Sequence, residues 1–413
     1  MLVPRKNRQK PMSTSIKDYT SFSCPNSKCK LYNQCGLDNI THHSWIGKIK
    51  NIRRLRCREC KKAFSENRGT LRERAKIDEA KQERLLKCFR WGVCEEGTAD
   101  ICEVNVKTVQ LFRSKAAKQA QMYHETEVKE VKAAGVQLDE IRVKQAGKIT
   151  WAAVAIAMGS FLILGLSVGK RTQGLADQLL AQVWGRCQLI GIFLSDGWSC
   201  YFNAILRCCA RLYKPRSKQR GRKLAKRLKF DRSSAFYGQV IKQTKDKFRL
   251  CAIRCKALIG TMSECLFFIK TYELGNKIHT SHIERWFGTL RCHIASLRRK
   301  SRCFGKCETI LSERIWIFIW FHNWTLTHDS LTINGIKRTP AMVAGLSEHP
   351  LTYRDLIHLR VKENWQLRER IQTKLKEMQS KEVMDAAKRT KRPRGQESVI
   401  WKAPPQGKQR KAA

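Results

Sequence analysis

The chain has 413 residues, enough for two or three domains with a sizeable core. It carries 82 Lys and Arg against 35 Asp and Glu, and the resulting formal net charge of +47 is spread along its whole length. Such an excess favours nucleic acid as the partner, with a cationic membrane-surface protein as the weaker alternative. The basic first ten residues are not followed by the apolar run of a secretory signal, so we expect a cytoplasmic protein whose 18 cysteines are reduced or bound to metal.

A basic leader over residues 1–20, which we expect to be disordered, precedes two close pairs of cysteines. A structural Zn²⁺ requires four ligands that converge on one ion, and closely spaced cysteine pairs satisfy this need. Residues 21–70 therefore predict a zinc ribbon. The expected ligands are Cys24, Cys29, Cys57 and Cys60. Substitute ligands are Cys35, His42 and His43.

Residues 75–125 have the pattern of a helix-turn-helix domain. A helix from Ile77 ends near Gly92, a short helix covers 96–102, and a basic helix begins after Val104 and Asn105. In this motif the last helix enters the major groove of DNA. We expect Val109 and Phe112 to pack inward. The outward, DNA-contacting candidates are Lys107, Thr108, Gln110, Arg113 and Lys115.

Four strands are predicted next. The run VQLDEI predicts a strand that ends at Asp139 and Glu140. The uncharged run 149–169 is long enough to span a bilayer, but Gly159-Ser160 divides it, so we interpret it as two buried strands joined by a tight turn. A helix over 169–184 then leads to a buried strand that ends at Asp196.

The second half of the chain contains one strongly amphipathic helix. We expect 203–275 to be a basic insertion, with 211–230 either contacting DNA or flexible. From His279 onward, Ile283, Phe287, Leu290, Ile294 and Leu297 form an apolar stripe at helical spacing, and Glu284 lies beside it. The cations that flank the stripe and suit an anionic substrate are Arg285, Arg291, Arg298, Arg299 and Lys300.

An apolar, aromatic core helix is predicted over 307–325, followed by an extension of the core over 331–358. The polar, basic composition from 359 to 413 predicts a disordered tail.

Asp139, Asp196 and Glu284 belong to three separate elements, two strand ends and a helix. Hard cations such as Mg²⁺ or Mn²⁺ prefer oxygen ligands, and a pair of such ions needs carboxylates from different elements. A sheet with acids on its first and fourth strands and a third acid on a late helix is an RNase H-like arrangement. We therefore expect an α/β fold over 135–330, with a mixed sheet, flanking helices and metal-dependent phosphoryl transfer.

Several sequence blocks carry a family resemblance: VQLDEI, SDGWSCY, and HIERWFGTLRCHIASLRRKSRCFGK followed by CE. They resemble the catalytic blocks of bacterial insertion-sequence transposases of the DDE class, most of all the insertion-sequence-one family. Trp151, GKRT at 169–172 and TPAMVAGL at 339–346 also resemble that family, so the likeness covers about residues 24–358. The most specific matches are Ile283-Glu284-Arg285, Leu290-Arg291, His293, Ala295, Leu297, Arg299-Lys300-Ser301 and Lys306.

The resemblance implies that Asp139, Asp196 and Glu284 bind the catalytic metals and that the four cysteines named above bind zinc. It implies hydrolysis at the terminal inverted repeats of an insertion sequence to free 3′-hydroxyls, which then attack target DNA. A homodimer or higher oligomer in the bacterial cytoplasm, associated with the nucleoid, is expected. The long interval between Asp196 and Glu284 leaves Glu264 and Glu273 as alternative third acids.

Other functions remain open from the residues alone. One is a non-catalytic DNA-binding regulator or a domesticated, inactive transposase, although such a protein has no use for carboxylates that repel phosphates. A nuclease of the RNase H type would lack only strand transfer. A membrane-anchored basic protein would depend on the apolar run 149–169.

Overall fold

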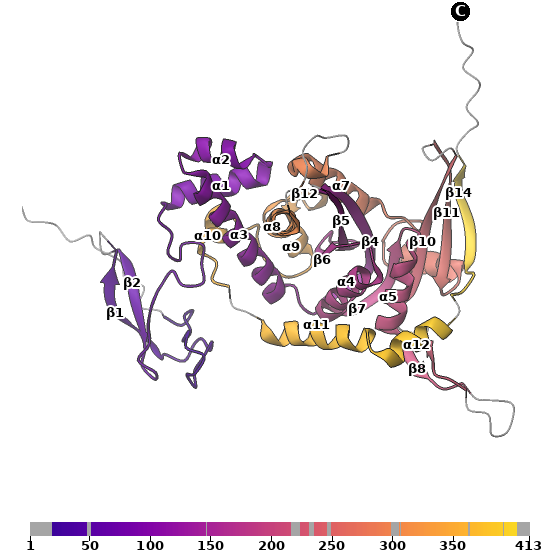
Figure 1. The fold of residues 1–413 in the computed structure, drawn as a ribbon, viewed down its shortest axis with the longest axis horizontal. Helices are drawn as coiled ribbons and strands as arrows, with labels where there is room; N and C mark the ends of the chain where they lie inside the picture. Colours follow the sequence, from indigo (N-terminus) through magenta and orange to yellow (C-terminus); the bar gives the residue numbers. More distant parts are fainter. Residues whose placement is uncertain are drawn as a thin grey trace, which may run out of the picture. The chain divides into compact units, whose positions relative to one another are not determined.

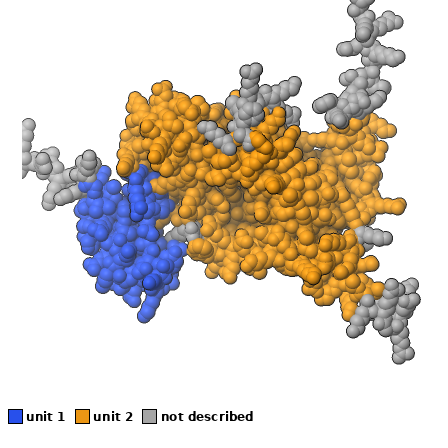
Figure 2. Space-filling model, viewed as in Figure 1, with its two compact units in different colours: residues 1–75 blue, residues 76–413 orange. Residues whose placement is uncertain are grey.

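The computed structural model describes residues 19–47, 51–145, 147–215, 224–230, 235–245, 249–298, 305, 307–361, 364–390 and 392–402. The chain divides into two compact units, residues 1–75 and 76–413 (Figure 2). The expected leader lies outside the described residues up to 18, as does the end of the expected tail from 403.

Unit 1 contains a three-stranded antiparallel sheet of β1 (Ile40–Ile46), β2 (Ile52–Cys57) and β3 (Ala63–Ser65). Its apolar core is small, because short strands can bury only a few side chains. That core consists of Phe22, Ile40, Leu55 and Phe64 packed with Cys24, Cys29 and Cys57. A domain with so little apolar burial needs a further source of stability, and the cysteines in its core are the obvious candidates for one.

Unit 2 begins with three helices, α1 (Glu79–Trp91), α2 (Glu95–Cys102) and α3 (Val106–Glu127). The Asp78 side chain caps α1 by accepting from Lys81 N, and Asn105 caps α3 by accepting from Lys107 N. Three successive helices in this region were predicted, and all three are present. They belong to the same compact unit as the main sheet, and in this unit α3 packs against α8 (Glu308–Trp320) (Figure 1).

The main sheet of unit 2 has seven strands in the order β14-β11-β10-β7-β4-β5-β6 (Figure 1). The central strand β7 is parallel to both of its neighbours, β4 and β10, and all other neighbours are antiparallel. A mixed α/β fold is therefore confirmed. The strands are β4 (Val131–Gln145), β5 (Lys148–Ala157), β6 (Ile163–Gly169), β7 (Cys187–Ser195), β10 (Phe236–Lys245), β11 (Arg249–Ile259) and β14 (Gln396–Lys402).

Helices cover the sheet. α4 (Gln173–Arg186) contacts β5, β6 and β7 and packs against α5 (Ser199–Cys209). α6 (Met262–Thr271) contacts β7, β10, β11 and β14, and α7 (Ser281–His293) contacts β4 and β5. The core beneath α6 includes Ile192, Leu194 and Val240 from the strands and Ile269 from the helix.

The apolar run 149–169 forms β5 and β6, as predicted. Gly159 in the connecting turn has a positive φ of 83°, a conformation that glycine adopts without strain. Among the described residues, no helix is both long and apolar enough to cross a membrane.

Shorter elements complete unit 2. β8 (Arg211–Tyr213) pairs with β9 (Arg227–Lys229), and β12 (His328–Ile333) pairs with β13 (Ile336–Arg338). The core helix α8 continues into a π-helical turn, Phe321–Thr325. Further short helices are Ala295–Leu297, α9 (Pro340–Val343) and α10 (Tyr353–His358).

The prediction that a strand ends at Asp139 is wrong, because β4 continues to Gln145. Beyond the two acids, Ile141, Val143 and Gln145 are buried while Arg142 and Lys144 are exposed, the alternation of a half-buried strand. In the expected insertion 203–275, β10 and β11 are integral strands of the main sheet.

The predicted disordered tail is also wrong over much of its length. Residues after 364 form α11 (Trp365–Met378) and α12 (Lys381–Arg389), and β14 then pairs with β11 at the edge of the sheet. The apolar positions that hold these helices are few and lie among many charges. The buried ones are Leu367, Met378, Val383 and Ala386.

Candidate metal centres and nucleic-acid interface

The parallel pairing of β4 with β7 brings two distant carboxylates together. Leu138 of β4 is in register with Ser195 of β7, so the residues that follow them, Asp139 and Asp196, lie at the same level of the sheet. Oxygens of Asp139, Glu140 and Asp196 all lie within 4.8 Å of one another. This acid cluster can hold a divalent cation, which prefers carboxylate oxygens.

Backbone groups fix two of these carboxylates. Asp196 Oδ1 accepts a hydrogen bond from Trp198 N at 3.0 Å, in the turn that leads to α5. Asp139 Oδ1 accepts from Glu140 N at 2.8 Å. Each bond uses one oxygen and leaves the carboxylate further capacity to accept, so both side chains are oriented and still able to bind a cation.

Glu140 is a member of the cluster that the sequence analysis did not select. Its side chain is only 2% exposed and accepts a hydrogen bond from Arg171 Nε at 2.8 Å. The Arg171 guanidinium lies between two indoles, 4.8 Å from the ring centroids of both Trp151 and Trp198. Two cation–π contacts and an ion pair therefore hold Arg171 against the cluster. Neighbouring side chains of a regular strand point to opposite faces, so no local pattern marks Glu140 as a partner of Asp139.

Glu284, the third predicted acid, lies in the first turn of α7 and is outside the group of three. Its Oε1 accepts from Lys242 Nζ at 2.6 Å and from Thr280 Oγ1 at 2.7 Å. Glu284 nevertheless lies near enough for its charge to raise the pKa values of both Asp139 and Asp196. The structure thus brings Asp139 and Asp196 together and keeps Glu284 beside them, held by Lys242.

Gln137 attaches the start of α7 to β4. Its Oε1 accepts from Ile283 N at 3.0 Å, and its Nε2 donates to His279 O at 3.0 Å. Gln137 and Asp139 are two residues apart on one strand and so share a face, which is the face that α7 covers. Of the alternative acids, Glu264 accepts from Thr261 N in the cap of α6, and Glu273 is exposed just after that helix.

The electrostatics of the acid cluster favour added positive charge. Burial, together with the charges of Asp196 and Glu140, raises the pKa of Asp139 to about 8. Burial also raises the pKa values of Asp196 and Glu140, although Arg171 acts in the opposite direction on both. Crowded, partly desolvated carboxylates repel one another until a proton or a cation neutralises them. The residues present therefore fit a divalent metal.

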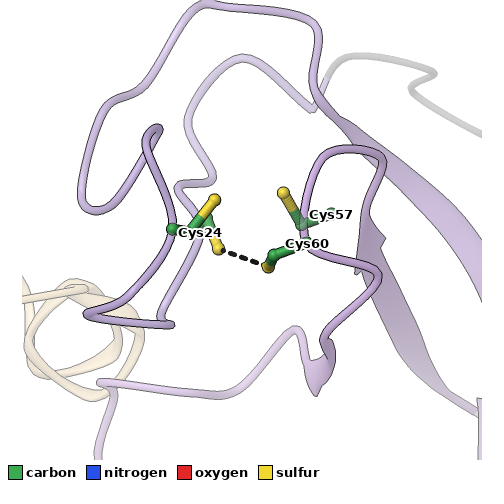
Figure 3. Close-up of side chains that lie close together, drawn as sticks. Cys24, Cys57 and Cys60 are labelled. Atoms are coloured by element: carbon green, nitrogen blue, oxygen red, sulfur yellow. Dashed lines mark hydrogen bonds between the residues drawn. The ribbon is translucent and has the colours of Figure 1, made fainter.

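Unit 1 contains a second candidate metal centre, in which four thiols converge (Figure 3). The Sγ atoms of Cys24, Cys29, Cys57 and Cys60 all lie within 4.8 Å of one another, and those of Cys24 and Cys60 are 3.4 Å apart. A hydrogen bond from the Asn26 side chain lowers the pKa of Cys60 to about 6. The predicted ligand set is brought together and can hold a structural zinc, because Zn²⁺ binds four thiolates tetrahedrally.

The substitute zinc ligands are elsewhere. The Cys35 thiol is exposed and donates to Ser21 O at 3.5 Å. His42 and His43 are exposed on β1. None of the three belongs to the group of converging thiols within the described part of the chain.

The candidate DNA-contacting residues of α3 divide between two faces. Lys107 and Gln110 are exposed, Thr108 and Lys115 are partly exposed, and Val109 and Phe112 are buried as predicted. Gln110 Nε2 also donates to Glu95 Oε2 at 2.8 Å.

Arg113 was expected to face DNA, and this is wrong: its side chain is 7% exposed. It forms ion pairs with Glu95 of α2 and Glu313 of α8, the latter at 2.8 Å. The helical spacing from Val109 and Phe112 continues to Arg113 on the inward side, where the two acids neutralise its charge.

The five apolar residues of the predicted stripe are buried, but the helix is shorter than predicted. α7 ends at His293, so only Ile283, Phe287 and Leu290 belong to it, while Ile294 is its extended C-cap residue and Leu297 lies in the short helix Ala295–Leu297. Among its flanking cations, Arg285 and Arg298 are exposed and Arg291 is partly exposed. Arg299 and Lys300 lie outside the described residues.

Comparison with known proteins gives no family for this chain. No protein-family model matches it, and no curated protein matches it significantly. The function must therefore be inferred from the two centres and the charged surfaces around them.

Proposed function

We propose that this chain is a DNA transposase of the DDE class, in which Asp139, Asp196 and Glu284 bind divalent metal ions for phosphoryl transfer. The main support is the register of β4 with β7, which puts Asp139 beside Asp196 although they are far apart in the sequence. The resemblance of the three sequence blocks to insertion-sequence transposases supports the same assignment.

The strand order supports the finer proposal of an RNase H-like core. Counted along the chain from β4, five strands lie in the order three-two-one-four-five, with the first three antiparallel and the last two parallel to the first. One acid is on the first strand, the next follows the fourth strand, and Glu284 is on a later helix. We propose that β11 and β14 extend this core at one edge.

In the proposed reaction the carboxylates of Asp139 and Asp196 would hold the divalent cations. Bound Mg²⁺ or Mn²⁺ would supply Lewis-acid stabilisation and an activated oxygen nucleophile. Arg171 fixes Glu140 and supplies a compensating positive charge next to the cluster. Lys242 orients Glu284 and, as an exposed cation, is available to a DNA phosphate.

The remaining parts supply DNA binding in this proposal. The helices α1, α2 and α3 act as a helix-turn-helix that recognises the terminal inverted repeats, with Lys107 among the contacts. Unit 1, with zinc bound, adds a basic surface for phosphates. The protein acts as a homodimer or higher oligomer, since two element ends must be handled together, and it works on DNA in the bacterial cytoplasm.

A second candidate function is a DNA-binding regulator derived from a transposase. One observation favours it: the Glu284 carboxylate is engaged by Lys242 and Thr280 rather than grouped with the other acids. The two candidates differ in a single property, divalent-metal-dependent cleavage of DNA.

The test is incubation of the full-length protein with labelled duplexes carrying the DNA that flanks its gene, with Mg²⁺ present or omitted. We expect nicked products with 3′-hydroxyls and joined products with the wild type. Asp196→Asn and Glu284→Gln should retain binding and lose both products, whereas the control Glu264→Gln should keep them. Binding without cleavage by the wild type would support the regulator instead.

A further inference from the structure

Unit 2 contains a cavity that the proposed reaction does not use. Its volume is about 110 Å³, and it lies between α7, the end of α8 and β12. This is well below the roughly 300–1,000 Å³ of sites for drug-sized ligands, so the cavity suits one small planar group. Aromatic side chains form much of its wall, and polar residues surround its opening.

The wall is built for flat, unsaturated groups. Trp286 of α7 lies against Phe318 of α8, with ring centroids 5.8 Å apart. Phe161 contacts the ring of His282 at 4.8 Å, and His322 contacts His328 at 4.8 Å. Aromatic and imidazole faces stack well on heterocycles, independently of the exact ring.

Polar atoms buried in these wall residues have no partner among the described residues. They are Trp286 Nε1, His282 Nδ1 and His328 Nε2. Buried donors and acceptors without partners destabilise a protein, so a polar ligand that reached these three atoms would gain from bonding to them. Such a ligand must offer both hydrogen-bond donors and acceptors, since a Trp only donates and an imidazole can do either.

The interior is neutral, which argues against a phosphate or carboxylate ligand. Burial lowers the pKa of His322 to about 3. Burial likewise lowers the pKa of His328. The opening differs, because Arg285, Thr289 and Ser330 are exposed there. A cationic opening and a neutral aromatic interior match a nucleotide whose phosphate stays outside and whose base enters.

The cavity lies close to the acid cluster along the sheet. Ile156, which lines it, is in register with Gln137, while Val154 is in register with Asp139. Two residues of a strand span about 7 Å, comparable to the separation of neighbouring phosphates in a DNA strand. Arg285 at the opening directly follows Glu284 in α7. A DNA strand held at the acid cluster thus passes the opening of the cavity about one nucleotide away from that cluster.

We infer that this cavity, here called the base pocket, receives one unstacked nucleobase of the DNA strand held at the acid cluster, with the adjoining phosphate at Arg285. The inference deepens the proposed function and depends on its assignment of DNA to this face. Because taking a base out of a duplex costs free energy, the pocket should favour DNA in which a base is already unpaired.

The test is fluorescence anisotropy of the full-length protein without added Mg²⁺, on three labelled duplexes. One is fully paired, one has a single unpaired adenine, and one has an abasic residue in place of that adenine. We expect the unpaired adenine to bind about tenfold more tightly than the abasic duplex, the scale of one base stacked on aromatic side chains. Equal affinities for these two duplexes would overturn the inference.

Ser330→Trp should fill the opening and remove the preference while leaving affinity for the paired duplex unchanged. The matched control is Thr332→Trp, at an exposed position of the same strand outside the cavity lining, which should keep the preference. A preference that survives Ser330→Trp would contradict the base pocket.

The pocket and the proposed function can fail separately. A preference for the unpaired base without metal-dependent cleavage would support the base pocket and contradict the transposase function. Metal-dependent cleavage without a preference for the unpaired base would contradict only the base pocket. Failure to bind any of the three duplexes would contradict both.

Discussion

At Asp139 the burial of the side chain conflicts with its negative charge. It lies within a long strand, beside Asp196 and Glu140, and these surroundings raise its pKa to about 8. A free Asp has a pKa near 3.8, so the folded protein holds this proton more tightly than the unfolded chain does. The stabilising contribution is therefore complete below pH of about 4 and is lost as the pH rises through about 8.

Asp139→Asn should stabilise the protein when no divalent cation is added, because Asn resembles the protonated acid and carries no charge. The rise in melting temperature over the wild type should grow between pH 5 and pH 9. Thermal unfolding of zinc-loaded protein at a series of pH values measures this. Added Mn²⁺ should then raise the melting temperature of the wild type and not that of Asp139→Asn. Equal melting temperatures of the wild type and Asp139→Asn at pH 8.5 without Mn²⁺ would show that the Asp139 charge does not destabilise the fold.

In the two candidate metal centres, the sequence alone identified the residues whose role can be recognised from their neighbours in the sequence. Asp139 lies within an apolar strand and Asp196 directly follows one, and the four cysteines occur in close pairs. Glu140, Arg171 and Lys242 were not found, because their roles depend on partners from other elements. Trp151 and Arg171 were noted only as parts of a resemblance, and it is the sheet that brings them together around Glu140.

At the scale of elements, α3 shows how one helix divides its cations between structure and binding. Arg113 is buried between Glu95 and Glu313, whereas Lys107, near the helix start, is exposed. Removing a partner from a buried ion pair leaves an uncompensated charge in a region of low dielectric constant. Removing an exposed cation leaves the fold unchanged and weakens only the binding of phosphates.

Arg113→Met should lower the free energy of unfolding by about 3 kcal/mol, since it leaves the Glu313 carboxylate without this partner. The matched variant Lys107→Met should change it by less than about 0.5 kcal/mol. Urea unfolding followed by circular dichroism measures both. DNA affinity should fall with Lys107→Met and become less dependent on salt. A stability loss with Lys107→Met as large as that of Arg113→Met would contradict this division.

The elements with strong periodicity were predicted, and those hidden among charges were not. The buried strands β5, β6 and β7 and the helix α8 are apolar enough to be identified directly. In contrast, α11 keeps only Leu367 and Met378 among its buried apolar positions, in a segment rich in Lys, Arg and Glu. β14 belongs to the main sheet because β11 offers an open edge, which no local pattern in the sequence reveals.

At the scale of the whole molecule, the net charge of +47 belongs to the whole chain, whereas its two compact units differ in what stabilises their folds. Positive charge spread along the chain promotes association with DNA of any sequence. Unit 1 has a small core around four thiols, while unit 2 has an extensive core around the main sheet. Only unit 1 should therefore depend on zinc for its fold.

Zinc removal should unfold unit 1 and leave unit 2 folded, because binding of a structural zinc is part of the folding free energy of a small domain. The wild-type protein should contain zinc, Cys57→Ser should lose it, and Cys35→Ser should retain it. Zinc content by atomic absorption, together with limited proteolysis, tests both. Retention of zinc by Cys57→Ser would contradict the assigned ligands. Proteolytic cleavage throughout unit 2 after zinc removal would show that unit 2 also depends on zinc for its fold.

In the proposed function, Asp139 of β4, Asp196 directly after β7 and Glu284 of α7 bind the metal ions that support DNA cleavage. The most direct measurement is the rate of DNA cleavage by Asp196→Cys in Mg²⁺ and in Mn²⁺, against the wild type in both. A thiolate is a poor ligand for the hard Mg²⁺ and a better one for Mn²⁺. We expect the wild type to cleave with either ion and Asp196→Cys to cleave only with Mn²⁺. Undiminished cleavage by Asp196→Cys in Mg²⁺ would contradict the assignment of Asp196 as a metal ligand.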